Sequence, residues 1–569
     1  MSGPTPAVAA ALLALRKRPD SAAAWNRLGV AFRASGNWAG AAKAFGEVAR
    51  RAPSDEARAR WVDACLAARD PRQAHGALQS GPVSDPGMRW RQVGDLASAK
   101  GLAYLAADAY EAAVQVLPDD SGLRVVAGMA AVTAGEGMRG LAHLEHAVVL
   151  APDHVESWAK LCVVQEICGQ PEAARTSALR TLALQPAEPH ASLVLAKLHR
   201  SAGAHREALK TLEGGDFSVA PDWIRVRRHH EEGQCWDRMK DEAQAFAGFV
   251  RMNEEAERRS TVDRSAMVAW RSMVDALGPV QDALLAAAAV PWSPPEDGPP
   301  PVFLAGFPRS GTTLLEYMLG AHPALQPTDE TPAVDALIGQ LPRLLGGQAV
   351  YPAILEGRLQ DPALRTQLRA QCRQIFAALR PGLPDDRRVI DKMPFSTVHV
   401  ALISALFPDA HFMCIHRDPR DTALSCFMQD FIFNGAMGHM MRMDDIVDVQ
   451  QAVFGLWRQA RPAIPIPVQE VHYEALVDDP EATARRLIGG LGLPWSDAVL
   501  GYRSRLEGQH ISTPSYNQVN QKIYGRAAGR WHRYTAQLAP WRAALDRNAA
   551  VLGYGVDGDL RGARPGDAE

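Results

Sequence analysis

The stretch that decides the fold of the second half of this chain is VFLAGFPRSGTT (residues 302–313), which runs directly into LLEYML (314–319). Its apolar start is typical of a buried strand, its glycine-bounded middle of a turn, and its end of a helix start. The outline is that of a phosphate-binding loop, Gly-x-x-x-x-Gly. However, Thr312 stands where such loops carry lysine, and Arg309 lies inside the loop instead. The pattern favours an anionic ligand other than ATP.

The residue types in this loop suit an anion. Gly306 and Gly311 allow backbone angles that a Cβ would forbid, so successive amides can turn inward. The first turn of the following helix adds unpaired N–H groups and the positive end of its dipole. The side chains that can add charge or hydroxyl donors are Arg309, Ser310, Thr312 and Thr313. The alternative is an ordinary strand-to-helix turn without a ligand, and this concentration of donors argues against it.

Length and composition restrict the class of protein. The chain has 569 residues, 47% of them hydrophobic, so we expect at least two domains with ample cores. The net charge of −3 gives no indication of nucleic-acid binding. No apolar run reaches the roughly 18 residues that a membrane-spanning helix needs. The start of the chain lacks a secretory pattern, and its seven cysteines are scattered without a CxxC pair. We therefore expect a cytoplasmic protein.

The first half of the chain is repetitive. Pro118, Pro152 and Pro186 are 34 residues apart, and Pro221 follows at 35. Small and aromatic residues recur at matching offsets between these prolines, and proline ends a helix because it cannot donate to the preceding turn. Over roughly residues 20–255 the pattern resembles the tetratricopeptide-repeat family, whose members form α-solenoids. The resemblance implies that the array binds a protein partner or the substrate; a purely scaffolding or dimerising array is the alternative.

Three segments follow from these patterns. We expect an all-α tetratricopeptide-repeat solenoid over residues 1–282 and an α/β domain with a parallel central sheet over residues 302–560. Between them, residues 283–301 are rich in alanine and then in proline. Such a density of proline does not fit a helix or a central strand, so this segment is expected to be the linker.

The second half alternates strand-like and helix-like runs, which indicates a parallel α/β sheet. The expected strands are residues 302–305, 388–390, 411–416 and 467–473. Ligands of such sheets bind at the carboxyl ends of the strands. Three cations and a phenol stand at or just after those ends: Arg309, Lys392, Arg417 and Tyr473. Their convergence predicts a polyanionic ligand.

These residues have the pattern of a known family. The loop PRSGTTL (308–314) resembles the 5′-phosphosulfate loop of sulfotransferases that use 3′-phosphoadenosine 5′-phosphosulfate (PAPS). The segment 412–425, with Arg417 and then Ser425 eight positions later, resembles their 3′-phosphate segment. The arrangement is most similar to the tyrosylprotein sulfotransferases and to bacterial relatives fused to tetratricopeptide repeats. The resemblance covers about residues 300–540 and implies a P-loop-like sulfotransferase domain.

The resemblance also implies a role for each matching residue. Glu330 stands where the family has its catalytic base, and Lys392 and Ser515 where it stabilises the leaving oxygen. The donor-binding set implied is Arg309, Ser310, Gly311, Thr312, Thr313, Arg417, Ser425, Tyr473 and Arg530, with Arg530 in the element that closes over the nucleotide. No metal is expected, because fixed cations neutralise the charge. The implied reaction is in-line transfer of the sulfuryl group to a hydroxyl.

One departure bears on the acceptor. The tyrosylprotein enzymes carry an arginine two residues after the base, whereas this chain has Pro332. The sequence therefore leaves open whether acidic peptides are recognised, and a protein tyrosine, another peptide, a sugar or a small alcohol or phenol are all candidate acceptors. Two other classes stay open: a P-loop nucleotide kinase, and a non-catalytic repeat scaffold. The missing loop lysine argues against the first and the complete residue set against the second. Oligomeric state is not readable from the sequence.

Overall fold

The computed structural model describes residues 5–259, 263–380, 382–384, 386–502 and 528–560. The chain forms two compact units, Met1–Ile224 and Arg225–Glu569. Each unit has hydrophobic clusters of its own. Within the described residues, no helix has the length and apolar character needed to cross a bilayer.

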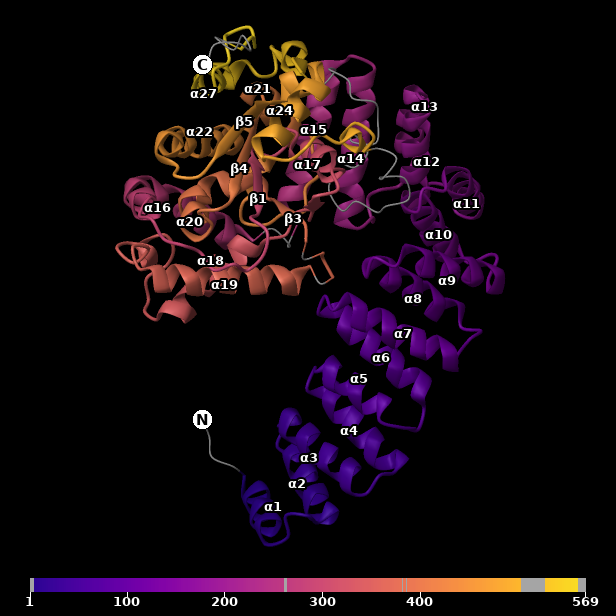
Figure 1. Cartoon of the computed structure of the whole chain (residues 1–569). Helices are drawn as coiled ribbons and strands as arrows, with labels where there is room; N and C mark the ends of the chain where they lie inside the picture. The colour runs from indigo at the N-terminus through magenta and orange to yellow at the C-terminus, as the bar shows by residue number, and fades with distance from the viewer. Residues whose placement is uncertain (1–4, 260–262, 381, 385, 503–527, 561–569) are drawn as a thin grey trace. The chain divides into compact units, whose positions relative to one another are not determined.

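The first unit is a stack of helices joined in successive pairs, coloured indigo to purple in Figure 1. The helices are α1 (Pro6–Lys17), α2 (Ala22–Ala34), α3 (Trp38–Arg51), α4 (Asp55–Ala67), α5 (Pro71–Gln79), α6 (Pro86–Ala99), α7 (Ala103–Val116), α8 (Ser121–Thr133), α9 (Gly137–Leu150), α10 (Val155–Ile167), α11 (Pro171–Leu184), α12 (Pro189–Ser201) and α13 (His205–Gly214).

The packing inside the pairs explains the repeated residues. A Cβ on Gly29 would lie 2.6 Å from the ring of Phe45, and one on Gly94 would lie 2.7 Å from the ring of Tyr110. The small residue of the first helix therefore lets the aromatic ring of the second helix approach its backbone. Pro118 and the other repeat prolines each follow the end of a second helix. The predicted tetratricopeptide-repeat architecture is confirmed.

The second unit begins with helices that the sequence placed in the solenoid or linker. These are α14 (Asp222–Arg238), α15 (Glu242–Glu257) and α16 (Arg264–Ala288). Phe249 and Leu277 belong to the same core cluster as Phe303 of the sheet. The unit boundary thus lies near residue 224, whereas the sequence placed the end of the solenoid at residue 282. Helical periodicity shows which face of a helix is apolar but not which partner covers that face.

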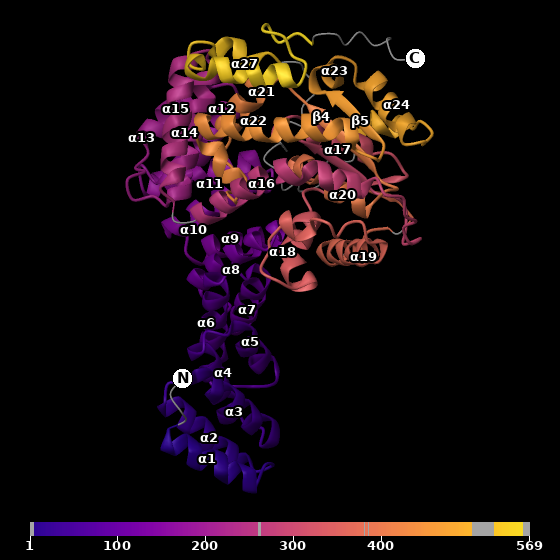
Figure 2. The same cartoon turned by 90° about the vertical axis from the view of Figure 1, so that its left-hand side faces the viewer.

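The sheet of the second unit is parallel, as predicted, with strand order β2-β3-β1-β4-β5. Its strands are β1 (Val302–Gly306), β2 (Leu325–Pro327), β3 (Arg388–Lys392), β4 (His411–His416) and β5 (Val468–His472). The sequence missed β2, which is only three residues long and pairs with the edge of β3. Figures 1 and 2 show the strands inside the unit with helices around them.

Both faces of the sheet are covered, and successive residues of β1 alternate between the two cores. Phe303 joins the larger core with α16 and α20, while Leu304 joins a second core with α17. Figure 2 shows α23 and α24 beside β5. The helices after α16 are α17 (Thr312–Gly320), α18 (Ala333–Leu345), α19 (Pro362–Leu379), α20 (Val400–Leu406), α21 (Pro419–Phe427), α22 (Met443–Ala460), α23 (Tyr473–Asp478), α24 (Pro480–Gly490) and α27 (Arg542–Val551). Short 3-10 helices are η1 (Ala353–Leu355), η2 (Pro394–His399), η3 (Met437–Met441), η4 (Arg461–Ala463), η5 (Asp497–Val499), η7 (Arg530–Tyr534) and η8 (Ala539–Trp541).

Candidate active site

The loop between β1 and α17 has the geometry expected of an anion cradle. Arg309 and Gly311 both adopt positive φ, +68° and +106°, which turns the backbone sharply before the helix. Thr312 and Thr313 are buried in the first turn of α17. The Ser310 hydroxyl is buried and has no hydrogen-bond partner among the described residues. A buried donor of this kind fits a ligand oxygen.

The strand ends bring the predicted residues to the same edge of the sheet. Lys392 is the last residue of β3, Arg417 follows β4 directly, and Tyr473 follows β5 directly. Because all strands run in parallel, their carboxyl ends share the edge at which Gly306 opens the loop. The structure therefore places all four segments at one edge, as the sequence predicted.

Arg309, Arg417 and Ser425 form one connected group. Arg309 Nε donates to Ser425 Oγ at 3.2 Å, and Arg417 Nη1 donates to the carbonyl of Arg309 at 3.0 Å. The Arg417 guanidinium also lies over the Tyr473 ring, 4.8 Å from its centroid. Arg417 and Ser425, which the family resemblance assigned to one phosphate, thus both contact Arg309 of the loop.

Positive charge accumulates around the loop. Burial, together with the neighbouring charges of Arg417 and Arg530, lowers the pKa of Arg309 to about 10 against the opposing effect of Cys426. Cations that depress one another's pKa become more stable when an anion enters between them. This electrostatic pattern supports a ligand with more than one negative charge.

A second group surrounds Lys392, whose side chain is fully buried. Its Nζ lies 2.9 Å from Glu330 Oε1 and 3.5 Å from Glu316 Oε2. Burial alone would lower the pKa of Lys392, but the charges of Glu316 and Glu330 outweigh it and raise the pKa. Glu330 is 41% exposed, while Glu316 is fully buried. The predicted base and cation therefore meet directly, with Glu330 facing solvent.

Two carboxylates near these groups were missed by sequence reasoning. Glu316 lies on α17 and contacts Lys392. Its position among apolar residues of the helix was the sequence feature that could have indicated a buried carboxylate. Asp421 is buried on α21, 3.8 Å from Arg417, and accepts from the backbone N–H groups of Gly529 and Trp531 at 2.7 and 2.8 Å. Burial raises the pKa of Asp421 to about 6 against the effect of Arg417. Asp421 therefore joins Arg417 to residues 529–531 (Gly-Arg-Trp), the segment that contains Arg530.

Two further predicted residues are Arg530 and Ser515. Arg530 pairs with Asp237 of α14 at 2.8 Å, so α14 holds the predicted closing element. Ser515 lies outside the described residues. Among the described residues, no group of three or more histidine, cysteine, aspartate or glutamate side chains is arranged to hold a metal ion.

A family model matches this part of the chain: residues 300–497 match the model described as "Sulfotransferase family". Residues 300–497 form a sulfotransferase-family domain. Protein-tyrosine sulfotransferase 1 of Danio rerio is 28% identical over 271 residues, which is 45% of this chain and 75% of that protein. The matching stretch covers 31% of the length of a similar protein from Aquifex aeolicus. It covers 52–75% of the protein-tyrosine sulfotransferases of Danio rerio, Caenorhabditis elegans and Drosophila melanogaster.

Similar solved structures exist for both units. The sulfotransferase domain from the Synechococcus PCC 7002 olefin synthase is 21% identical, with a TM-score of 0.31, over 47% of this chain and 99% of that chain. A thermophilic TPR protein of Thermus thermophilus is 20% identical, with a TM-score of 0.23, over 37% of this chain and 98% of that chain.

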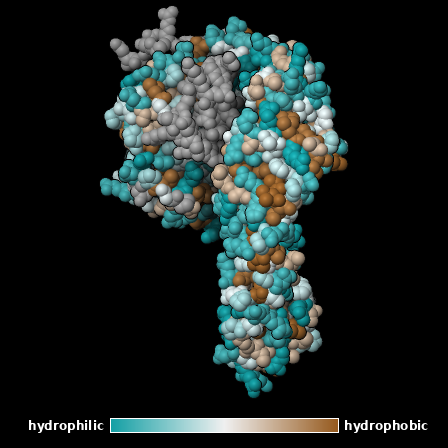
Figure 3. All heavy atoms as spheres, turned by 90° about the vertical axis from the view of Figure 1, so that its right-hand side faces the viewer, coloured by the Kyte–Doolittle hydropathy of each residue, from teal (hydrophilic) through white to brown (hydrophobic). Residues whose placement is uncertain are grey.

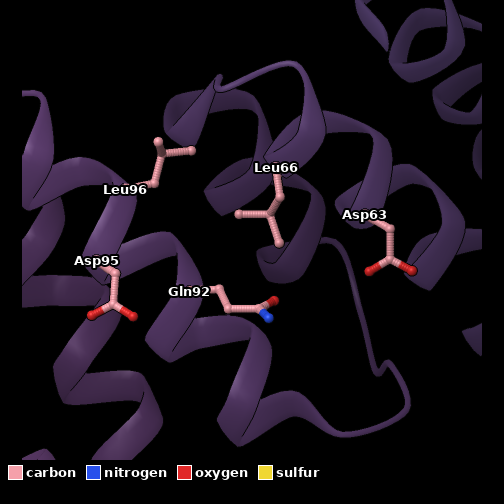
Figure 4. Close-up of a pocket in the computed structure, with 5 residues that line it drawn as sticks. All are labelled: Asp63, Leu66, Gln92, Asp95 and Leu96. Atoms are coloured by element: carbon pink, nitrogen blue, oxygen red, sulfur yellow. The ribbon is translucent and has the colours of Figure 1, made fainter. Parts of the chain in front are cut away.

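The repeat unit carries an open hollow of about 530 Å³. Figure 4 shows its lining: Asp63 and Leu66 from α4, and Gln92, Asp95 and Leu96 from α6. These are the first helices of successive pairs. On the face drawn in Figure 3, hydrophobic residues, coloured brown, lie scattered over the surface. The exposed large apolar or aromatic side chains of the repeats include Tyr104, Met138 and Val149.

Proposed function

We propose that the second unit transfers the sulfuryl group of PAPS to an acceptor hydroxyl. The observation that carries the proposal is the arrangement at the carboxyl edge of the sheet. A glycine-bounded loop follows β1 and carries Arg309 and the buried, unpartnered Ser310 hydroxyl. The strand order places β1 between β3, which ends at Lys392, and β4, which is followed by Arg417. Lys392 contacts Glu330, and Arg417 contacts the loop at the Arg309 carbonyl. The sulfotransferase-family match over residues 300–497 supports it.

The loop and the Arg417–Ser425 segment suit the two ends of the donor. The loop from Arg309 to Thr313 would hold the 5′-phosphosulfate through its amides and hydroxyls, and Arg417 with Ser425 would hold the 3′-phosphate. Tyr473 would contact the adenosine. Its ring lies against Gly311, where a Cβ would come within 2.6 Å, so the loop and this side chain are closely packed.

The reaction divides between Glu330 and Lys392. The acceptor oxygen attacks sulfur, its proton passes to the carboxylate of Glu330, and the bond from sulfur to the bridging oxygen breaks. Negative charge grows on the 5′-phosphate that leaves, and Lys392 stabilises it. Lys392 must then exchange its contact with Glu330 for the leaving phosphate. Ser515 is proposed for the same oxygen because of its place in the family pattern.

A hydroxyl without flanking acidic groups is the acceptor we propose, with a tyrosine in a protein or peptide as the first candidate. The similar protein of Danio rerio is named a protein-tyrosine sulfotransferase. Two residues after Glu330, however, Pro332 stands where the family has arginine. The carboxylates of Asp329 and Asp335 are already paired, with Arg380 at 3.2 Å and with His399 at 3.5 Å. An acidic peptide would therefore find no arginine at position 332 to attract it. We therefore expect uncharged tyrosine peptides to be better substrates.

The repeats are proposed to bind the acceptor protein or a partner, with the hollow between α4 and α6 as one candidate contact. A reducing compartment, the cytoplasm, is proposed as the location. The seven cysteines are free thiols, and all except Cys168 are buried.

Calorimetric titration with 3′-phosphoadenosine 5′-phosphate (PAP), the product nucleotide, tests the donor site. We expect PAP to bind to the full chain and ATP to bind far more weakly. Arg417→Ala should weaken PAP by at least about 30-fold, since a charge-assisted contact to phosphate is lost. Arg458→Ala, an exposed arginine on α22, is the matched control. Stronger binding of ATP, or no binding of either nucleotide, would overturn the proposal.

A further inference from the structure

The carboxylate of Glu316 joins three elements of the site from its buried side. Glu316 lies in the middle of α17, and its side chain is fully buried. Its Oε1 accepts from the backbone N–H of Asp329 at 2.8 Å and of Thr328 at 3.3 Å. Its Oε2 lies 3.5 Å from Lys392 Nζ. One side chain therefore contacts the turn before Glu330 and the cation at the end of β3.

The turn that Glu316 holds is the turn that presents Glu330. Asp329 has a φ of +55°, a left-handed conformation that non-glycine residues rarely adopt. The two amides bonded to Glu316 belong to the two residues immediately before Glu330. On the other side, Thr328 Oγ1 donates to the carbonyl of Ile390 at 2.9 Å, which ties the turn to β3. The direction of Glu330 thus depends on these contacts.

The carboxylate of Glu316 also interacts electrostatically with Lys392. Lys392 contacts Glu316 of α17 and Glu330 of the turn, and the charge of Asp329 also acts on it. Its chain neighbour Asp391 points to the other face of the sheet and is close enough to interact with it electrostatically. Glu330 is exposed and would take up a proton in the reaction, whereas Glu316 is enclosed and contacts no solvent. Glu316 is therefore the carboxylate that stays beside Lys392 when Glu330 changes charge.

We propose that Glu316 is a positioning residue, which fixes the turn carrying Glu330 and holds Lys392 opposite it. This role rests on the proposed sulfuryl transfer, because it acts through the proposed base and cation. It does not touch the substrate. The neighbouring Tyr317 offers a comparison, since its hydroxyl donates to the Asp329 side chain at 2.6 Å on the same turn. Among the described residues Tyr317 forms no hydrogen bond with Lys392, so variants of Glu316 and Tyr317 distinguish support of the turn from support of the cation.

The test uses the full chain and the variants Glu316→Gln, Glu316→Ala and Tyr317→Phe. Hydrogen exchange of the peptide 325–332 is measured by mass spectrometry, PAP binding by calorimetry, and turnover of PAPS with 4-nitrophenol as acceptor. The glutamine keeps an oxygen that can accept from the two amides but removes the charge. The alanine removes both.

We expect Glu316→Ala to increase exchange in 325–332 at least about tenfold, while Glu316→Gln changes it little. Glu316→Gln should lower kcat about tenfold or more with KM for PAPS within about threefold, and Tyr317→Phe should keep kcat within about threefold. If Glu316→Ala does not fold, the kcat of Glu316→Gln alone tests the positioning role of Glu316. Unchanged exchange in a folded Glu316→Ala, or an unchanged kcat in Glu316→Gln, would overturn the role. Failure of the wild-type chain to bind PAP would instead overturn the proposed function.

Discussion

Asp391 shows how a single residue beside the site carries an electrostatic cost. Its side chain is 5% exposed, and its Oδ1 has no hydrogen-bond partner among the described residues. Burial raises the pKa of Asp391 to about 8, with added effects from Asp335 and Glu316. In the unfolded chain an aspartate titrates near 4. Between about pH 4 and pH 8, Asp391 is therefore protonated in the folded protein, whereas the unfolded chain has already lost this proton.

The sign of the resulting pH dependence follows from that difference. A raised folded-state pKa gives stability that is fully present below about pH 4 and is lost as the pH rises to about 8. Asp391→Asn stays neutral throughout, so its melting temperature should exceed that of the wild type more at pH 8.5 than at pH 5.5. We expect the gap to widen by a few degrees, since 1 kcal/mol shifts Tm by roughly 2–4 °C in domains of this kind.

Calorimetric melting at the two pH values measures this effect. Asp282→Asn is the control, because Asp282 is an exposed carboxylate on α16 of the same unit. Its Tm difference from the wild type should be the same at both pH values. An equal difference for Asp391→Asn at both pH values would show that the carboxyl is not held protonated.

At the scale of one element, the loop between β1 and α17 depends on a glycine for two reasons. Gly311 has a φ of +106°, and a Cβ there would lie 2.6 Å from Cδ2 of Tyr473. Alanine would have to leave the left-handed region or displace the ring. Either change would move the amides that the proposed donor site uses.

Gly311→Ala is therefore expected to weaken PAP binding by at least about tenfold and to lower stability by about 1–2 kcal/mol. Calorimetric titration and denaturant unfolding measure the two effects. Gly339→Ala in α18 is the matched control, because nothing lies within 4 Å of a Cβ at that position. It should leave binding unchanged and stabilise the helix slightly. Normal PAP binding by Gly311→Ala would show that the loop tolerates a Cβ.

At the scale of the whole molecule, the second unit needs helices that precede its sheet. Besides the shared core, Asn253 Nδ2 donates to the carbonyl of Phe427 at 2.8 Å, and Gln281 Nε2 donates to that of Leu456 at 2.7 Å. Asp237 of α14 pairs with Arg530 and accepts from the Tyr534 hydroxyl at 2.7 Å. These buried polar contacts would be left unpaired without α14–α16.

We expect a fragment of residues 221–569 to unfold cooperatively and to bind PAP within about threefold of the full chain. A fragment of residues 302–569, cut at the predicted domain start, should aggregate or lack a melting transition. Each large apolar side chain lost from the core costs about 1.5–3 kcal/mol, and Phe249, Leu277 and Leu284 are all absent from it. Circular dichroism melting and calorimetry compare the two. A stable, PAP-binding 302–569 fragment would contradict the boundary near residue 224.

Features set by local pattern were readable from the sequence alone. The proline spacing marks helix ends because proline cannot continue a helix, and it predicted the repeats. The glycines of 306–313 and the apolar runs before them predicted the loop and the strands. Because strand ends of a parallel sheet share one edge, the placement of Lys392, Arg417 and Tyr473 followed as well.

Only the tertiary structure decided features that depend on contacts distant in sequence. The amphipathic faces of α14–α16 predict burial but not the sheet domain as their partner. The sequence pattern predicted no catalytic or donor-binding role for the acidic residues Glu316, Asp391 and Asp421. Folding encloses all three at the edge of the site. The energy of a buried charge depends on which groups surround it, and that neighbourhood exists only once the chain has folded.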